Sequence, residues 1–276
     1  GIENKKFNNI SFPWQADDLS EITKAEIPNY LTSWYSKPLD SEPSKTVMVY
    51  ANKDARKINL WVKNHALKNG KDLAVSDLLI LNNNINIPDE TGFGQPTKLY
   101  NGMFLLINSV GETISKTVPL RQSKKPIVLH FTKVHVTCLS LPNRLETDLY
   151  LLDNYFTSES GLSKEEQIAF RVFVNQLVSV KTKESPFEMS PEYIQMQQDK
   201  NYKEVLDNEA DLKKRYESGE KVRTKLDAEQ RELRKIERSY KRNFRNRLLS
   251  NITQNDPFVN AGHVHYGWAL TVHKCI

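Results

Sequence analysis

The feature that most restricts the possible folds is an apolar run near the end of the chain, residues 268 to 272, followed at once by His273 and Lys274. Apolar side chains on both faces of an extended strand are typical of a central strand in a parallel sheet that helices cover on each side. Ligands of open α/β sheets bind outside the carboxyl ends of the strands. Thr271, His273 and Lys274 bring a hydroxyl, an imidazole and an ammonium group to that end, so the sequence predicts contact with an anion such as phosphate.

A second strand-to-helix unit is predicted near the start of the chain. Residues 46 to 50 read as a buried strand, and apolar residues then recur at helical spacing from Asp54 to Leu67 before Gly70. Asn52 and Lys53 lie where the strand passes into the helix, a position at which backbone and side-chain amides can hold phosphate. An ordinary Asn helix cap explains Asn52 equally well, and both interpretations remain open.

The pattern changes between residues 71 and 141. Short β runs are separated there by clusters of Asn, Gly and Pro. Several strands within about 70 residues predict a small β-barrel.

Residues 142 to 254 have a helical pattern. Ser163 with Glu166 forms a capping box, and Pro191 suits the first position of a helix. The long stretch that follows is broken only at Gly219, which permits either an antiparallel helical hairpin or one continuous helix.

Positive charge is concentrated in this helical region. Residues 213 to 247 hold 14 Lys and Arg against 6 Asp and Glu, a net charge of +8, whereas the whole chain carries +5. The rest of the chain is therefore slightly acidic, and the basic character belongs to one element. That element either faces nucleic acid or is a solvated surface with i,i+4 ion pairs such as Glu237 with Lys241.

Several classes of protein are disfavoured. The two cysteines, Cys138 and Cys275, have no metal or redox spacing, which fits a reducing cytoplasm. No apolar run approaches the roughly 18 residues that span a bilayer, and no export signal is evident. His263, His265 and His273 invite a metal interpretation, but no carboxylate or thiol joins them at ligand spacing, so we expect no metal site.

The order of motifs resembles superfamily 1 DNA helicases of the RecD-like and Dda-like group. Residues 269 to 274, Ala-Leu-Thr-Val-His-Lys, resemble motif V of that family, although Cys275-Ile276 departs from the usual Ser/Ala-Gln-Gly. Asn52-Lys53, with Asn59 and Lys63 on the following helix, resembles the motif IV region. Residues 256 to 261, Asp-Pro-Phe-Val-Asn-Ala, match the turn that leads into motif V.

The resemblance implies an α/β fold in three parts. Residues 1–68 and 255–276 would form an incomplete second RecA-like domain with a parallel sheet. Residues 71–141 would form an inserted small Src-homology-3-like β-barrel, and residues 142–254 a helical insertion with a long basic helix or hairpin. Because the chain begins at Gly1 and ends just after a sheet strand, we expect a piece of a longer protein.

The resemblance also implies site residues. Thr271, His273 and Lys274, with Asn52 and Lys53, would contact single-stranded DNA, while Asn59 and Lys63 would lie at the nucleotide. Thr271 as an ordinary strand residue and Lys274 as a solvated lysine are the alternatives. Lys63 stands where the family often has Arg, and a lysine does not reproduce the two-pronged guanidinium contact.

The implied function is ATP-dependent translocation along DNA by the intact protein. ATP and magnesium would bind between this domain and a missing N-terminal RecA-like domain. No Walker A loop occurs in the chain, so we expect no bound cofactor and no ATP hydrolysis by this stretch alone. The alternative is a non-catalytic module, derived from a helicase, that binds nucleic acid or docks a protein.

Overall fold

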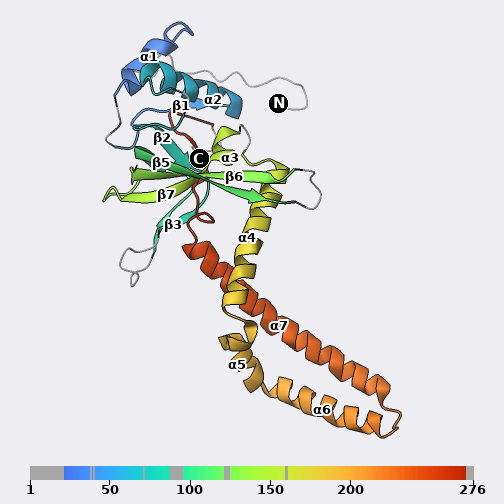
Figure 1. Cartoon of the computed structure of the whole chain (residues 1–276). Helices are drawn as coiled ribbons and strands as arrows, with labels where there is room; N and C mark the ends of the chain where they lie inside the picture. The colour runs from blue at the N-terminus through green and yellow to red at the C-terminus, as the bar shows by residue number, and fades with distance from the viewer. Residues whose placement is uncertain are drawn as a thin grey trace, which may run out of the picture.

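The computed structural model describes residues 22–37, 39, 41–70, 72–87, 96–120, 125–158 and 161–271. Thr271 is the last of these, so the predicted contacts of His273 and Lys274 lie outside the described residues. The fold is mixed α/β, with seven α-helices, a five-stranded antiparallel sheet and a small parallel pair of strands among the described residues (Figure 1).

The parallel pair joins the two ends of the sequence, as the resemblance implied. Its first strand is not the buried strand that residues 46 to 50 predicted, because Met48 is 65% exposed and Tyr50 is 86% exposed. Strand β1 (Val47–Val49) pairs in parallel with β9 (Ala269–Thr271), and Val49 lies opposite Thr271. Helix α2 (Asn52–Trp61) leaves the carboxyl end of β1 and continues into a π-helical turn, η1 (Val62–Ala66). Helix α1 (Ile27–Tyr35) packs against that turn. The start of α2 and the end of β9 therefore lie at the same edge of the pair.

The larger sheet has the order β7-β6-β5-β2-β8. Its strands are β2 (Leu78–Leu81), β5 (Phe104–Val118), β6 (Ile127–Cys138), β7 (Glu146–Leu152) and β8 (Val264–Tyr266). A separate short hairpin consists of β3 (Ile85–Ile87) and β4 (Thr97–Leu99).

The predicted small β-barrel is not detected among the residues that the structure describes. In the part of the chain that the structure describes, the outer strands β7 and β8 form no ladder with each other, and only the bridge between Leu151 and Gly262 connects that region. β7 comes from residues 142–254, where the sequence predicted only helices, and β8 comes from residues 255–276. Local sequence patterns locate strands but do not reveal that β8 pairs with β2 from nearly 200 residues away.

The helical region forms a stalk and a hairpin. After the short helix α3 (Asp153–Thr157), helix α4 (Lys164–Glu184) packs on β6 and leads away from the sheet (Figure 1). A 3-10 turn, η2 (Phe187–Met189), and α5 (Pro191–Gln198) connect it to α6 (Lys200–Glu217). Helix α7 (Arg223–Asn255) returns antiparallel along α6 to the sheet. The break at Gly219 is thus a hairpin, and Gly219 takes the positive φ of 94° that favours glycine.

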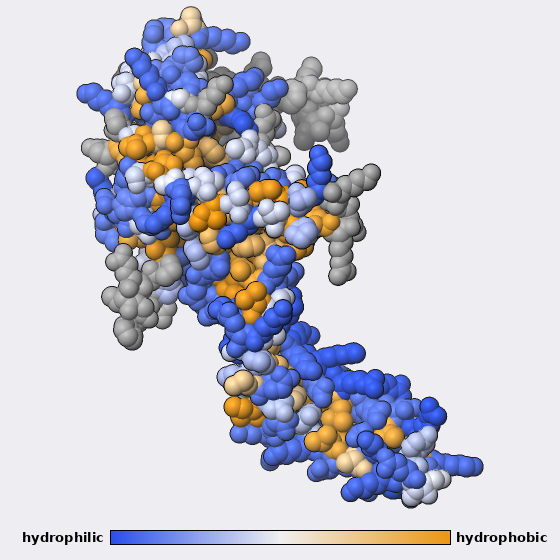
Figure 2. Space-filling view, viewed as in Figure 1, coloured by the Kyte–Doolittle hydropathy of each residue, from blue (hydrophilic) through white to orange (hydrophobic). Residues whose placement is uncertain are grey.

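Three apolar clusters hold these parts together. The largest joins α1, η1 and the sheet around residues such as Val62, Leu79 and Trp268. A second fixes α4 to the sheet through Phe131 and Phe173, and a third lies inside the hairpin around Phe244. The hairpin surface is mostly hydrophilic on the face that Figure 2 shows. None of the helices that the structure describes is both long and apolar enough to cross a membrane.

Candidate functional site

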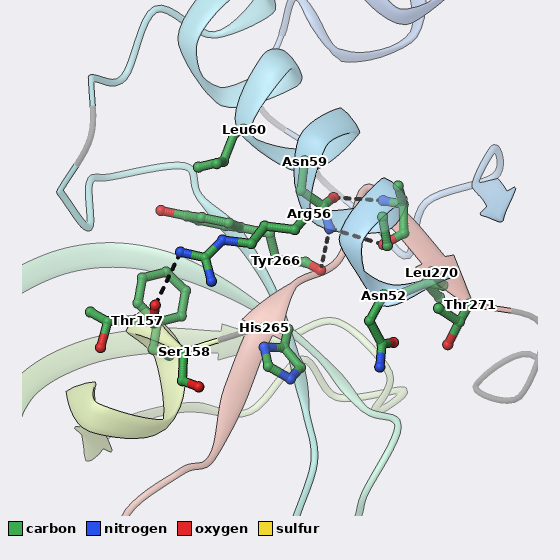
Figure 3. A pocket seen from close by; sticks show the side chains of 13 residues that line it. Asn52, Arg56, Asn59, Leu60, Thr157, Ser158, His265, Tyr266, Leu270 and Thr271 are labelled. Carbon is green, nitrogen blue, oxygen red and sulfur yellow. Dashed lines mark hydrogen bonds between the residues drawn. The ribbon is translucent and has the colours of Figure 1, made fainter. Parts of the chain in front are cut away.

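A pocket of about 170 Å³ lies where β9 ends and α2 begins (Figure 3). Its walls come from one face of α2, from β8 and β9, and from residues 156 to 158 at the end of α3. Of the predicted site residues, Asn52, Asn59 and Thr271 line it. Residues separated by more than 200 positions in the sequence therefore meet at one edge of the parallel pair, which is where an α/β sheet binds its ligands.

Asn59 fastens β9 to α2. Its Oδ1 accepts a hydrogen bond from the backbone N–H of Ala269 at 2.7 Å, and its Nδ2 donates to the carbonyls of Ala269 at 2.9 Å and Tyr266 at 3.1 Å. The side chain is only 4% exposed. Asn59 thus positions the strand that carries Thr271, and these internal contacts occupy the polar atoms that the resemblance would assign to a nucleotide.

Lys63 lies inside the fold and is fully buried. Its ammonium group forms an ion pair with Asp77, which also accepts hydrogen bonds from the Ala74 backbone N–H and from Asn69 Nδ2, both at 2.9 Å. The Lys63 Nζ atom is also 5.1 Å from the centre of the Tyr266 ring. A charge so enclosed and paired acts within the protein, and its position offers no support for the predicted nucleotide contact.

The start of α2 differs from an ordinary Asn cap. Ala51 is the N-cap residue, with extended backbone and no side-chain cap, so Asn52 is the first helical residue and its side chain faces the pocket. Lys53, the next residue, is exposed and does not line the pocket. Thr271, at the end of β9, also lines the pocket and is 5% exposed. The DNA contacts of Asn52, Lys53 and Thr271 stay predictions.

Arg56 is the residue that sequence reasoning missed. It lies one turn after Asn52 on the same face of α2, and its side chain extends across the pocket to donate a hydrogen bond of 3.0 Å to the Thr157 carbonyl (Figure 3). Among the described residues that line the pocket, Arg56 alone has a permanent charge, and no carboxylate faces it. The i,i+4 spacing from Asn52 was the signal that could have identified it.

Aromatic and imidazole rings form the remaining wall. Phe156 meets Tyr266 edge-on at 4.8 Å, and His265 lies 5.1 Å from the ring of Tyr155. His263, behind this wall, stacks on the same Tyr155 ring with the ring centres 4.7 Å apart, and burial lowers the pKa of its imidazole. Burial thus disfavours the charged form of His263. The described residues contain no group of three or more His, Cys, Asp or Glu arranged to hold a metal ion.

The site combines an anion-compatible end with an apolar wall. Arg56 and the uncapped first turn of α2 supply positive charge and N–H donors, while Phe156 and Tyr266 supply aromatic surface. Such a combination suits a phosphate with an attached planar group. A comparison of the chain with known protein families and with curated proteins finds no match.

Proposed function

We propose that this chain contributes a single-stranded DNA contact surface, and one side of an ATP cleft, to an ATP-dependent DNA helicase or translocase of superfamily 1 type. The observation that carries the proposal is the parallel pairing of β1 with β9, which brings Asn52 and Thr271 into one pocket with Arg56. A motor of this class needs such a contact at the carboxyl edge of its sheet.

The finer fold assignment is part of the same proposal. β1, α2 and β9 would be an incomplete RecA-like domain, and the five-stranded sheet would correspond to its Src-homology-3-like insertion. Residues 1–68 with 255–276, 71–141 and 142–254 remain the proposed parts. The sheet draws on all three, because β7 and β8 join β2, β5 and β6.

ATP hydrolysis would require more than this chain. The missing N-terminal RecA-like domain would supply the Walker A loop, and ATP with magnesium would bind between the two domains. ATP binding would change their spacing while the pocket holds and releases the DNA strand. A cytoplasmic location is proposed with this activity.

The non-catalytic module is the second candidate, and one observation favours it. Both residues that the resemblance implies at the nucleotide, Asn59 and Lys63, are committed to internal contacts. A nucleic-acid-binding or docking module would retain the pocket without any use for ATP.

The pocket is tested by replacing Arg56 with glutamine and measuring the affinity for a fluorescent oligo-dT strand by anisotropy. A hydrogen bond to a charged group contributes about 1.5–3 kcal/mol, so we expect Arg56→Gln to weaken binding by about tenfold or more. Lys57→Gln is the matched control, because Lys57 is an exposed cation on the same helix whose nearest ion-pair partner is Asp54 at 3.7 Å. Equal affinity of both variants would contradict the pocket assignment.

The motor and the module are distinguished by a second measurement, on this chain together with the N-terminal RecA-like domain that the motor proposal requires. If the motor proposal holds, ATP turnover depends on single-stranded DNA and falls in Arg56→Gln at subsaturating DNA. If DNA binding is intact but no ATP turnover occurs, the module is correct and the motor proposal fails.

A further inference from the structure

Five arginines form a straight row on the outer face of α7. They recur at spacings of three and four residues, and the structure leaves all of them exposed: Arg231, Arg234, Arg238, Arg242 and Arg245. With a rise of 1.5 Å per residue the row is about 21 Å long. We call this row the arginine ridge.

Within the part of the chain that the structure describes, none of the ridge guanidinium groups takes part in an ion pair. Arg231 donates to the Asp227 carbonyl at 3.0 Å, and Arg245 donates to Asn175 Oδ1 at 2.7 Å, both of which are uncharged acceptors. Like charges at i,i+4 cost about 0.2–0.5 kcal/mol per pair, so the ridge is unfavourable for the isolated helix.

Asp227 lies in line with the ridge, one turn before Arg231, but no ion pair joins the two among the described residues, and the other carboxylates beside the ridge lie elsewhere on the helix. Glu232 and Glu237 are roughly 100° or more around the axis from the centre of the ridge. Glu232 pairs with Lys235 at 3.2 Å. The ion pair predicted between Glu237 and Lys241 is not formed, because the Lys241 Nζ atom lies over the Phe187 ring at 5.7 Å. Between residues 231 and 245 the arginines and the glutamates therefore lie on different faces of α7, whereas a mixed solvated surface would alternate the two signs.

The ridge is not accompanied by the features that binding to single-stranded nucleic acid or to a membrane surface would need. The aromatic side chains of this stretch face the hairpin interior: Phe244 is 4% exposed, and the Tyr240 hydroxyl donates to Asp199 at 2.8 Å. No base-stacking platform accompanies the arginines, as binding of single strands requires. The apolar face of α7 is buried against α4, α5 and α6, so it is not free to enter a membrane surface.

From these observations we infer that the arginine ridge binds the phosphate backbone of double-stranded nucleic acid without reading its sequence. Guanidinium groups match phosphate oxygens in pairs of hydrogen bonds. Along one strand of a duplex, phosphates follow at about 3.4 Å along the axis, so the ridge spans roughly six of them. The ridge ends about 15 Å along α7 before the helix reaches the sheet, and the inference does not depend on the pocket or on ATP.

The test replaces four ridge arginines with glutamine, which has nearly the same helix propensity. A control variant replaces four exposed lysines of the hairpin, off the ridge, that form no ion pairs among the described residues. The ridge variant is R231Q/R234Q/R238Q/R242Q and the control is K203Q/K213Q/K214Q/K225Q. Both carry the same change in net charge, and circular dichroism checks that helix content is kept.

Affinity is measured for a blunt DNA duplex of about 24 base pairs between 50 and 200 mM salt. Each phosphate contact contributes about 0.9 to the slope of log affinity against log salt, so four contacts correspond to a change of about 150-fold over this range. We expect the ridge variant to lose this part of the salt dependence and the control to retain it. The double variant R231Q/R238Q, which perturbs the helix less, is expected to lose about half.

Four outcomes would overturn the inference: unchanged duplex affinity in the ridge variants, equal loss in the control, loss for oligo-dT alone, or loss for vesicles of anionic lipid alone. Arg56→Gln distinguishes this proposal from the pocket proposal. It is expected to weaken oligo-dT binding and to leave the duplex salt slope unchanged.

Discussion

Replacement of Lys63 provides a sharp test of how the site is built. Lys63→Met keeps roughly the length of the side chain. It leaves the Asp77 carboxylate, which is also fully buried, with only its hydrogen bonds to Ala74 and Asn69. Removing one partner of a buried ion pair costs about 3–5 kcal/mol. We expect the free energy of unfolding to fall by that amount, measured by urea denaturation followed by circular dichroism.

A double-mutant cycle isolates the pair. Asp77→Asn alone is also expected to cost about 3–5 kcal/mol, because it leaves the Lys63 ammonium uncompensated. The variant K63M/D77N should be more stable than the sum of the single effects, by about 1–3 kcal/mol. Lys57→Met, at an exposed position of α2, serves as the control, and its free energy of unfolding is expected to stay within about 0.5 kcal/mol of the parent. The reasoning is refuted if Lys63→Met matches this control in stability yet removes nucleotide binding, because Lys63 would then be a ligand.

Three further perturbations have defined outcomes. Asn59→Ala should destabilise the fold by about 2–4 kcal/mol and speed hydrogen exchange at the Ala269 amide, since a buried N–H loses its acceptor; unchanged exchange would contradict the fastening role. Because burial lowers the pKa of His263, the unfolded state takes up the proton at a higher pH than the folded state. The free energy of unfolding should therefore fall as the pH drops below about 6.5 and level off beneath the folded pKa. His263→Phe, which keeps the stack on Tyr155, should show a smaller fall than the parent, and an identical pH dependence would contradict this role of His263. Phe244→Ala should lower stability of the hairpin by about 3–5 kcal/mol while oligo-dT affinity stays unchanged, measured by denaturation and anisotropy, and a large loss of affinity would show that hairpin and pocket are coupled.

Local signals in the sequence predicted the local structure well. Ser163 is the N-cap of α4 with both hydrogen bonds of the capping box, and Pro191 occupies the first position of α5. The apolar run at residues 268 to 272 indicated a parallel sheet, and the resemblance implied that β9 lies in one sheet with β1, which the structure pairs in parallel. These features could be predicted because each depends on residues close together in the sequence or on a pattern typical of a single kind of sheet.

Pairings between strands far apart in the sequence could not be predicted from local patterns. The sheet order depends on β8 joining β2, and no periodicity encodes that choice. The hairpin is favoured over a single helix because α6 and α7 contribute residues such as Val205 and Ile236 to one buried apolar cluster, whereas Gly219 alone permits both arrangements.

The site was predicted only in part for the same reason. Asn52, Asn59 and Thr271 come together in the pocket, but the ionic partner of Lys63 is 14 residues away in a segment with a different pattern. A lysine on a helix is normally exposed, so its burial with Asp77 follows from tertiary packing.

The most direct test of the central claim is hydrogen–deuterium exchange of this chain with and without oligo-dT. If the edge formed by β9 and the start of α2 holds the strand, protection should appear in residues 52 to 60 and 266 to 271, and Arg56→Gln should reduce it. Protection confined to α7, or none in either segment, would contradict the account.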